Sequence, residues 1–305
     1  MKLFQTLFIA LITVSILGCE DDVYPELEQS ESKVVVDAWI TNEPVPQTVK
    51  ITETLPYFTN EFAPGIENAI VYIVEDGGEQ FNFLPSNVKG SYVWTPSASQ
   101  PVLGTVGNNY ELHIQWNNIE VSSYSTLNRV PPVDSVTFSF ESGSFIPDSY
   151  FAEFFARDPV GAGDTYWIKT YKNGSFLNRP NEINLAFDAG TSAGANVDGL
   201  YLIQPIRNAI NPFETDEKDN LISPYNPGDS IMVEMYSITN EAFNFLTELR
   251  IQTDRPGGFA ELFAVPLSNI PTNMVSTQDL VLGYFNMSAV SRNAAFLDPN
   301  DLPVD

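Results

Sequence analysis

The chain has 305 residues, of which 39 are acidic and 14 are lysine or arginine, so its formal net charge is −25 at pH 7. This charge argues against nucleic acid and against direct docking on anionic lipid, because both are bound through clustered lysine and arginine side chains. The hydrophobic fraction of 43% and the aromatic fraction of 12% predict a globular protein with a packed core and exclude a disordered chain.

Residues 1–18 have the pattern of a cleavable signal peptide. Met1-Lys2 is a short positive segment, residues 3–17 are apolar, and Gly18 supplies the small residue that a signal peptidase needs before its cut. The alternative is a membrane-spanning helix, which needs about 20 apolar residues and therefore a longer run. Cys19 follows the predicted cut directly and is the only cysteine of the sequence. We therefore predict a bacterial lipoprotein that is held to a membrane by acyl chains on Cys19.

The residues after Cys19 are acidic. Glu20, Asp21 and Asp22 resemble the surface-export signal of Bacteroidota lipoproteins, and the alternative is the acidic start of a linker. We interpret residues 19–32 as the lipidated cysteine and its tether. The expected location is the outer membrane, with the protein facing the cell exterior.

Short apolar runs with period-two alternation recur in residues 33–130, and Pro, Gly and Asn separate them. Alternation of this kind, with turn residues between the runs, predicts an antiparallel β-sandwich. The alternating apolar residues are Val34, Val36, Ala38 and Ile40, then Val49 and Ile51, Ala69, Val71 and Ile73, Phe81 and Phe83, Tyr92 and Trp94, and Tyr110, Leu112, Ile114 and Trp116.

A second β-rich domain is predicted over residues 131–305. The segment Val130-Pro131-Pro132-Val133 marks the boundary, since two prolines stiffen the chain and remove backbone donors. Asn173-Gly174 predicts a hairpin turn, because both residues tolerate positive φ angles. Residues 188–199 and 211–229 are rich in Gly, Asn, Asp and Pro and are predicted to be loops. The predicted strands are Ser135–Phe140, Thr165–Tyr171, Leu200–Ile206 and Ile231–Ile238.

One helix is predicted near residues 239–252. Thr239 is a suitable N-cap, and Ile238 can pack on Phe243 as a hydrophobic staple. Phe243, Leu246 and Leu249 follow at helical spacing, and the pattern ends before Pro256. We expect this apolar stripe to pack against a sheet.

An ordered set of segments resembles a known family. These segments are Lys33–Pro44, Val49–Ile51, Leu55–Phe58, Ala69–Ile73, Gly90–Tyr92, Val106–Ile114, Val130–Ser135 and Val281–Phe285. Together they resemble the Bacteroidota lipoprotein family known as domain of unknown function 4249. The resemblance implies a surface lipoprotein encoded beside a TonB-dependent outer-membrane receptor, with an immunoglobulin-like or transthyretin-like N-terminal part. It transfers no catalytic residue, because none is established for the family.

Two features invite an enzymatic interpretation. Residues 190–194 match the G-x-S-x-G pattern of hydrolases, which requires a strand-to-helix turn and a later histidine. The residues that follow are poor helix formers, and the single histidine, His113, lies upstream on a predicted strand, so a flexible loop is favoured. Paired carboxylates could still catalyse hydrolysis, but the sequence cannot single out a pair.

Calcium and glycans are the candidate ligands. Asp188, Asn196 and Asp198 offer oxygen ligands, as do Asp216, Glu217 and Asp219, but neither set has the spacing of the twelve-residue calcium loop. Structural calcium stays open, with solvated acidic loops as the default. Trp39, Trp94, Trp116 and Trp167 could stack on a glycan, although aromatic residues in such runs are usually buried.

These observations favour a non-catalytic protein without a cofactor. The leading hypothesis is an accessory or binding subunit of a TonB-dependent transporter, anchored in the outer membrane. The alternatives are a stand-alone surface protein that binds glycan or peptide, and a carboxylate-dependent hydrolase.

Overall fold

The computed structural model describes residues 31–56, 59, 61–142, 148–212, 214, 216, 221–255, 270–278 and 280–302. The predicted signal peptide, Cys19 and the acidic residues Glu20, Asp21 and Asp22 lie outside this part. Residues Ser32–Leu55 and Thr59–Asp305 form one compact unit. Among the described residues, no helix is both long and apolar enough to span a membrane.

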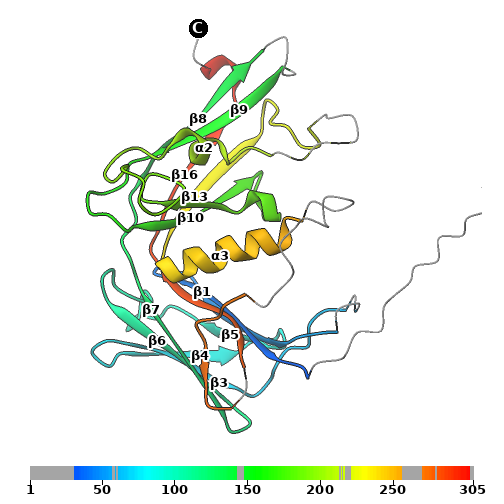
Figure 1. The fold of residues 1–305 in the computed structure, drawn as a ribbon, viewed down its shortest axis with the longest axis vertical. Coiled ribbons are helices and arrows are strands. Elements are labelled where there is room, and N and C mark those ends of the chain that lie inside the picture. Colours follow the sequence, from blue (N-terminus) through cyan, green and yellow to red (C-terminus); the bar gives the residue numbers. More distant parts are fainter. Residues whose placement is uncertain are drawn as a thin grey trace, which may run out of the picture. The chain divides into compact units, whose positions relative to one another are not determined.

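In the described residues, the first sheet contains nine strands in the order β14-β7-β6-β3-β4-β5-β2-β1-β15 and curls around a core (Figure 1). Most neighbours are antiparallel, whereas β1 and β15 run parallel. The strands are β1 (Val34–Thr41), β2 (Gln47–Glu53), β3 (Ile70–Glu75), β4 (Gln80–Pro85), β5 (Ser91–Trp94), β6 (Asn109–Trp116), β7 (Ile119–Thr126), β14 (Val275–Ser276) and β15 (Leu282–Ser288).

The core of this sheet confirms the predicted alternation. Val36, Ala38 and Ile40 are buried on β1 while Asp37 between them is exposed. The same alternation buries Leu112 and leaves His113 on the outer face of β6. Alternate side chains of a strand point to opposite faces, so a period of two places one set in the core.

The part of the chain that the structure describes forms a second sheet of five strands, in which β11, β10, β13 and β16 lie side by side in this order and β12 also pairs with β10. A separate hairpin of β8 and β9 packs against β16. The hairpin and the second sheet together enclose a second core. The elements are β8 (Val133–Glu141), β9 (Ser149–Ala156), β10 (Thr165–Lys172), β11 (Ser175–Leu177), β12 (Asn184–Phe187), β13 (Ser230–Ile238), β16 (Val290–Phe296), the short helices η1 (Pro180–Glu182), α2 (Gln204–Asn208) and η3 (Pro299–Asp301), and α3 (Asn240–Thr253).

Helix α3 confirms the predicted helix and its cap. The Thr239 hydroxyl accepts a hydrogen bond of 3.1 Å from the Ala242 N–H, which satisfies one of the free donors of the first turn. Leu246 is buried, and Phe243 and Leu249 are half-buried in a third apolar cluster. The helix packs against β10 and β15 (Figure 1), so it joins elements of both sheets.

Two tight turns have a left-handed backbone, and the one at Asn173-Gly174 confirms the predicted hairpin turn. Gly77 and Gly78 have positive φ angles of 109° and 93° in the turn between β3 and β4. Asn173 and Gly174 have φ angles of 49° and 78° in the hairpin that connects β10 and β11. Both turns use residues for which a left-handed backbone costs little.

The strand predicted at Leu200–Ile206 is wrong. Tyr201 makes an isolated bridge to Arg157, and the chain then enters the short helix α2. Pro205 stands in the first turn of this helix, where its fixed φ angle fits and its missing N–H is no loss. An apolar run with one proline is therefore compatible with either structure, and packing selects the helix.

The predicted boundary near residue 130 marks where the chain passes from one core to the other. Val130 packs against both clusters. The first sheet is nevertheless completed by β14 and β15, which come from the predicted C-terminal domain. At Gly283, with a φ angle of 96°, a Cβ atom would overlap the carbonyl oxygen of Val36, so glycine permits this close parallel pairing.

Candidate functional site

A cavity of about 430 Å³ opens at the start of α3. Its size lies within the range of about 300–1,000 Å³ that is typical of small-molecule sites. Six described segments build the wall: Asp76 in the β3–β4 turn, Asn109 at the start of β6, residues 124–126 at the end of β7, Thr239 and Glu241 at the start of α3, Asn273 just before β14, and Tyr284 on β15. The cavity is therefore a product of the tertiary fold.

Hydrogen bonds to the backbone of β15 fix one wall of the cavity. Asn273 accepts a bond of 3.0 Å from the Phe285 N–H and donates one of 2.8 Å to the Phe285 carbonyl. The Ser125 hydroxyl accepts a bond of 2.9 Å from the Met287 N–H. These polar groups are held in place by the fold before any ligand binds.

The charges of the cavity have one sign. Asp76 and Glu241 contribute carboxylates, and none of the lining residues in the described part of the chain is basic. Asn109 donates a hydrogen bond of 2.8 Å to Asp76, whereas Glu241 is exposed in the first turn of α3. An acidic residue at that position is favoured by the positive end of the helix dipole.

Tyr284 combines a packed aromatic ring with a buried hydroxyl. Its ring stacks on Trp39 at a centroid distance of 5.7 Å and lies 4.6 Å from Phe245. The side chain is only 4% exposed, yet within the described residues its hydroxyl has no hydrogen-bond partner of normal geometry. Burial raises the pKa of this hydroxyl to about 12, while the nearby Thr239 side chain lowers it in part and the charge of Glu241 raises it further.

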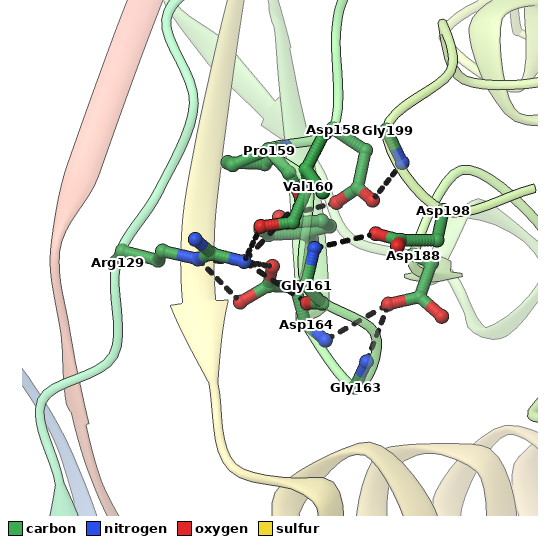
Figure 2. A network of polar contacts seen from close by, with 11 residues as sticks. Arg129, Asp158, Pro159, Val160, Gly161, Gly163, Asp164, Asp188, Asp198 and Gly199 are labelled. Carbon is green, nitrogen blue, oxygen red and sulfur yellow. Dashed lines mark hydrogen bonds and ion pairs between the residues drawn. The ribbon is translucent and has the colours of Figure 1, made fainter.

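A second polar site lies in loops of the other sheet. Carboxylate oxygens of Asp158, Asp188 and Asp198 lie within 4.8 Å of one another (Figure 2). Asp158 follows β9, Asp188 follows β12, and Asp198 ends the glycine-rich loop. Asp158 and Asp188 are only 2% and 4% exposed, whereas Asp198 is exposed. We call these three residues the aspartate cluster.

Backbone N–H groups already bond to the aspartate cluster. Asp188 Oδ1 accepts bonds of 2.7 and 3.0 Å from the Gly163 and Asp164 N–H groups. Asp198 Oδ1 accepts a bond of 2.9 Å from the Gly161 N–H, and the Gly199 N–H donates a bond of 3.1 Å to Asp158 Oδ2 (Figure 2).

The Tyr166 hydroxyl adds a bond of 2.7 Å to Asp158 Oδ1. Burial raises the pKa of Asp158, the bonds from Tyr166 and Gly199 lower it, and the charges of Asp164 and Asp188 raise it again. The aspartate cluster therefore links neighbouring loops by hydrogen bonds. Some charge repulsion remains between its carboxylates.

A cation would relieve that repulsion, but the ligand set is incomplete. Calcium takes six to eight oxygen ligands, and the cluster offers three carboxylates whose oxygens are largely engaged by N–H and O–H donors. Arg129 occupies further oxygens, since its Nη2 donates bonds of 2.9–3.3 Å to the carbonyls of Pro159, Val160 and Gly161. Its guanidinium also forms an ion pair of 2.6 Å with Asp164. This arrangement favours a structural role over a strong metal site.

Sequence reasoning identified part of the cluster. Asp188 and Asp198 were among the proposed calcium ligands, and the structure brings them together, whereas Asn196 is exposed. Asp158 was missed, and its only signal is its place directly after a strand and before a proline. In the other proposed set, Asp216 is described, and Glu217 and Asp219 lie outside the described residues.

The hydrolase motif does not adopt the required geometry. Gly190 makes an isolated bridge to Phe187, residues 191–194 form bends and turns, and the next residues continue as a loop, so no strand-to-helix turn exposes Ser192. His113 lies on β6 of the other sheet, where its ring stacks on Tyr72 at 4.8 Å and its Nε2 lies 3.3 Å from Glu111. The loop and the outward-facing strand histidine are confirmed.

The tryptophans pack within the protein. Trp94 is 3% exposed and Trp116 packs against the same core. Trp39 and Trp167 contact each other edge to face at 5.1 Å. Lys169 Nζ lies 3.9 Å from the Trp167 ring centroid, so one face of Trp167 holds a cation. Burial lowers the pKa of Lys169 to about 8.

Comparison with known proteins gives a family but no named activity. No curated protein matches the chain. A family model matches residues 20–294, and its description is a domain of unknown function, DUF4249. The match covers nearly all of the described fold, so both sheets and α3 lie within the region that the family model describes. The chain therefore belongs to the DUF4249 family.

Proposed function

We propose that this chain is a lipid-anchored, non-catalytic binding subunit that serves a TonB-dependent transporter at the outer surface of the outer membrane. The observation that carries the binding role is the open cavity at the start of α3, in whose wall Asn273 and Ser125 are held by hydrogen bonds to β15. Sites of this kind hold a ligand through a few fixed polar groups.

The anchor and the location rest on the sequence. The apolar segment before Gly18 and the position of Cys19 support lipidation, and Glu20, Asp21 and Asp22 support surface export. Cys19→Ser should leave the protein unlipidated and absent from the membrane fraction. Replacing the three acidic residues with alanine should keep the anchor but move the protein out of reach of protease added to intact cells.

The non-catalytic role rests on how the aspartate cluster uses its three converging carboxylates. In the aspartate cluster, N–H and O–H donors of the protein bond to the carboxylates, so they do not form a free acid–base pair. A hydrolase would lose its activity when one essential Asp or Glu is replaced by the corresponding amide.

Co-purification tests the transporter role. The full-length lipoprotein carrying a C-terminal tag is isolated from detergent-solubilised outer membrane, and its partners are identified by mass spectrometry. We expect a barrel protein in near-equal amount, and the Cys19→Ser variant is the control for chance capture. Recovery of the lipoprotein without a barrel would favour the alternative of a stand-alone surface protein that binds glycan or peptide.

A further inference from the structure

The charged and aromatic groups in the wall of the cavity at the start of α3 indicate which class of ligand it can bind. Both charged groups in its wall, Asp76 and Glu241, are acidic, and the described lining residues include no Lys, Arg or His. Tyr124, which is 64% exposed, adds an aromatic ring to the same wall, whereas the ring of Tyr284 is buried against Trp39 and Phe245. Carboxylates and aromatic rings both attract cations, the first by charge and the second by the negative face of the ring.

The hydrogen-bonding groups of the wall point to the same class. Glu241 is exposed at the helix start, and Asp76 accepts one bond from Asn109, which leaves capacity on its carboxylate. The buried Tyr284 hydroxyl has no partner of normal geometry in the described part of the chain. A buried polar group without a partner costs stability, and an N–H group of a ligand could satisfy it.

Anions are disfavoured here in spite of the nearby helix N-terminus. The Thr239 side chain already caps the Ala242 N–H, and the Glu241 carboxylate offsets the positive end of the helix dipole. An anion would therefore meet two carboxylates without a basic residue to balance them.

We propose that this cavity binds an organic cation, namely a ligand with an ammonium or guanidinium group held by Asp76, Glu241, the ring of Tyr124 and the hydroxyl of Tyr284. This inference rests on the proposed binding function and assigns the ligand class. The ligand is either a free amine or a basic side chain on a peptide, which share this chemistry.

Three five-carbon probes test the proposal with the full-length lipoprotein in detergent. Cadaverine carries an ammonium group at each end, pentanediol carries a hydroxyl at each end, and glutarate carries a carboxylate at each end. Binding is followed by saturation-transfer NMR and by titration of the chemical shifts. We expect cadaverine to bind, and its affinity to fall as salt is added. Pentanediol should bind more weakly, and glutarate should not bind.

Amide variants locate the site. Glu241→Gln removes a charge from the wall with little change of shape and should weaken cadaverine binding by about tenfold or more. Glu248→Gln is the matched control, because Glu248 is an exposed glutamate of the same helix that does not line the cavity. Tyr284→Phe keeps the ring and removes the hydroxyl, and it should weaken binding severalfold.

The outcomes separate this inference from the transporter role. Equal binding of cadaverine and pentanediol, preferential binding of glutarate, or equal effects of Glu241→Gln and Glu248→Gln would overturn the cation assignment. If a barrel still co-purifies in that case, the proposed function stands without it. A tripeptide with a central lysine and blocked ends, compared with cadaverine, distinguishes a peptide side chain from a free amine.

Discussion

The aspartate cluster and the cavity at α3 are both acidic, but they use their carboxylates in opposite ways. In the cluster, Asp158 and Asp188 are buried and accept hydrogen bonds from the protein itself. In the cavity, Glu241 is exposed and the Tyr284 hydroxyl is buried without a hydrogen-bond partner of normal geometry among the described residues. Convergence of acidic groups is therefore not enough to identify a site. The decisive question is whether the protein already supplies their donors.

The largest expected effect is on Asp188. Asp188→Ala should lower the free energy of unfolding by about 3 kcal/mol, because the Gly163 and Asp164 N–H groups lose their acceptor and alanine is strained in the left-handed backbone, where φ is 50°. Urea denaturation measures this loss. Asp188→Asn keeps an acceptor and tolerates that backbone, so it should lose less than half as much. If the alanine variant were as stable as the parent, the aspartate cluster would not stabilise the loops that it links.

Asp158 should make the stability of the cluster depend on pH. Its pKa is raised in the folded state, so the stabilisation from its proton is complete below the unfolded pKa and is lost as the pH rises through the folded pKa. Asp158→Asn loses the bond from the Gly199 N–H and should be about 1–2 kcal/mol less stable at pH 4. This deficit should shrink towards pH 7.

Denaturation at both pH values checks the sign of this effect. Asp134→Asn, at an exposed position of β8, is the control and should show little change between pH 4 and pH 7. A deficit of Asp158→Asn that grows towards pH 7 would mean that the ionised carboxylate is favoured by its surroundings.

Two tyrosines give a smaller and matched comparison. Tyr166→Phe removes the hydroxyl that bonds Asp158 and should cost about 1–2 kcal/mol of unfolding free energy. Tyr284→Phe removes a hydroxyl without a described partner and should be neutral or stabilising by less than about 1 kcal/mol. Thermal and urea unfolding of both variants measure these changes. An equal loss of unfolding free energy in Tyr284→Phe and Tyr166→Phe would contradict the comparison.

The smallest expected effect is that of calcium. Because protein donors engage most of the cluster oxygens, millimolar calcium should change the melting temperature by less than about 2 °C, as measured against a chelator. A rise above about 5 °C that Asp198→Asn abolishes would make the cluster a calcium site after all.

The sequence predicted the elements whose signals are local. Period-two alternation located most strands of the first sheet, and the Thr239 cap with the spacing of Phe243 and Leu246 located α3. The strand at Leu200–Ile206 failed because a short apolar run with one proline fits a strand or a helix turn equally well. The parallel pairing of β15 with β1 was not foreseen, since partners some 250 residues apart leave no local pattern.

The sequence by itself determined the acidic character, the β-rich class with one capped helix, and the grounds for predicting an anchor at Cys19. Each of these follows from composition or from neighbouring residues. Only the tertiary structure decided which acidic groups are engaged and which line a cavity. Residues from Asp76 to Tyr284 meet at the start of α3 because the last strands return to the first sheet. Packing between distant segments sets that arrangement, and no local periodicity encodes it.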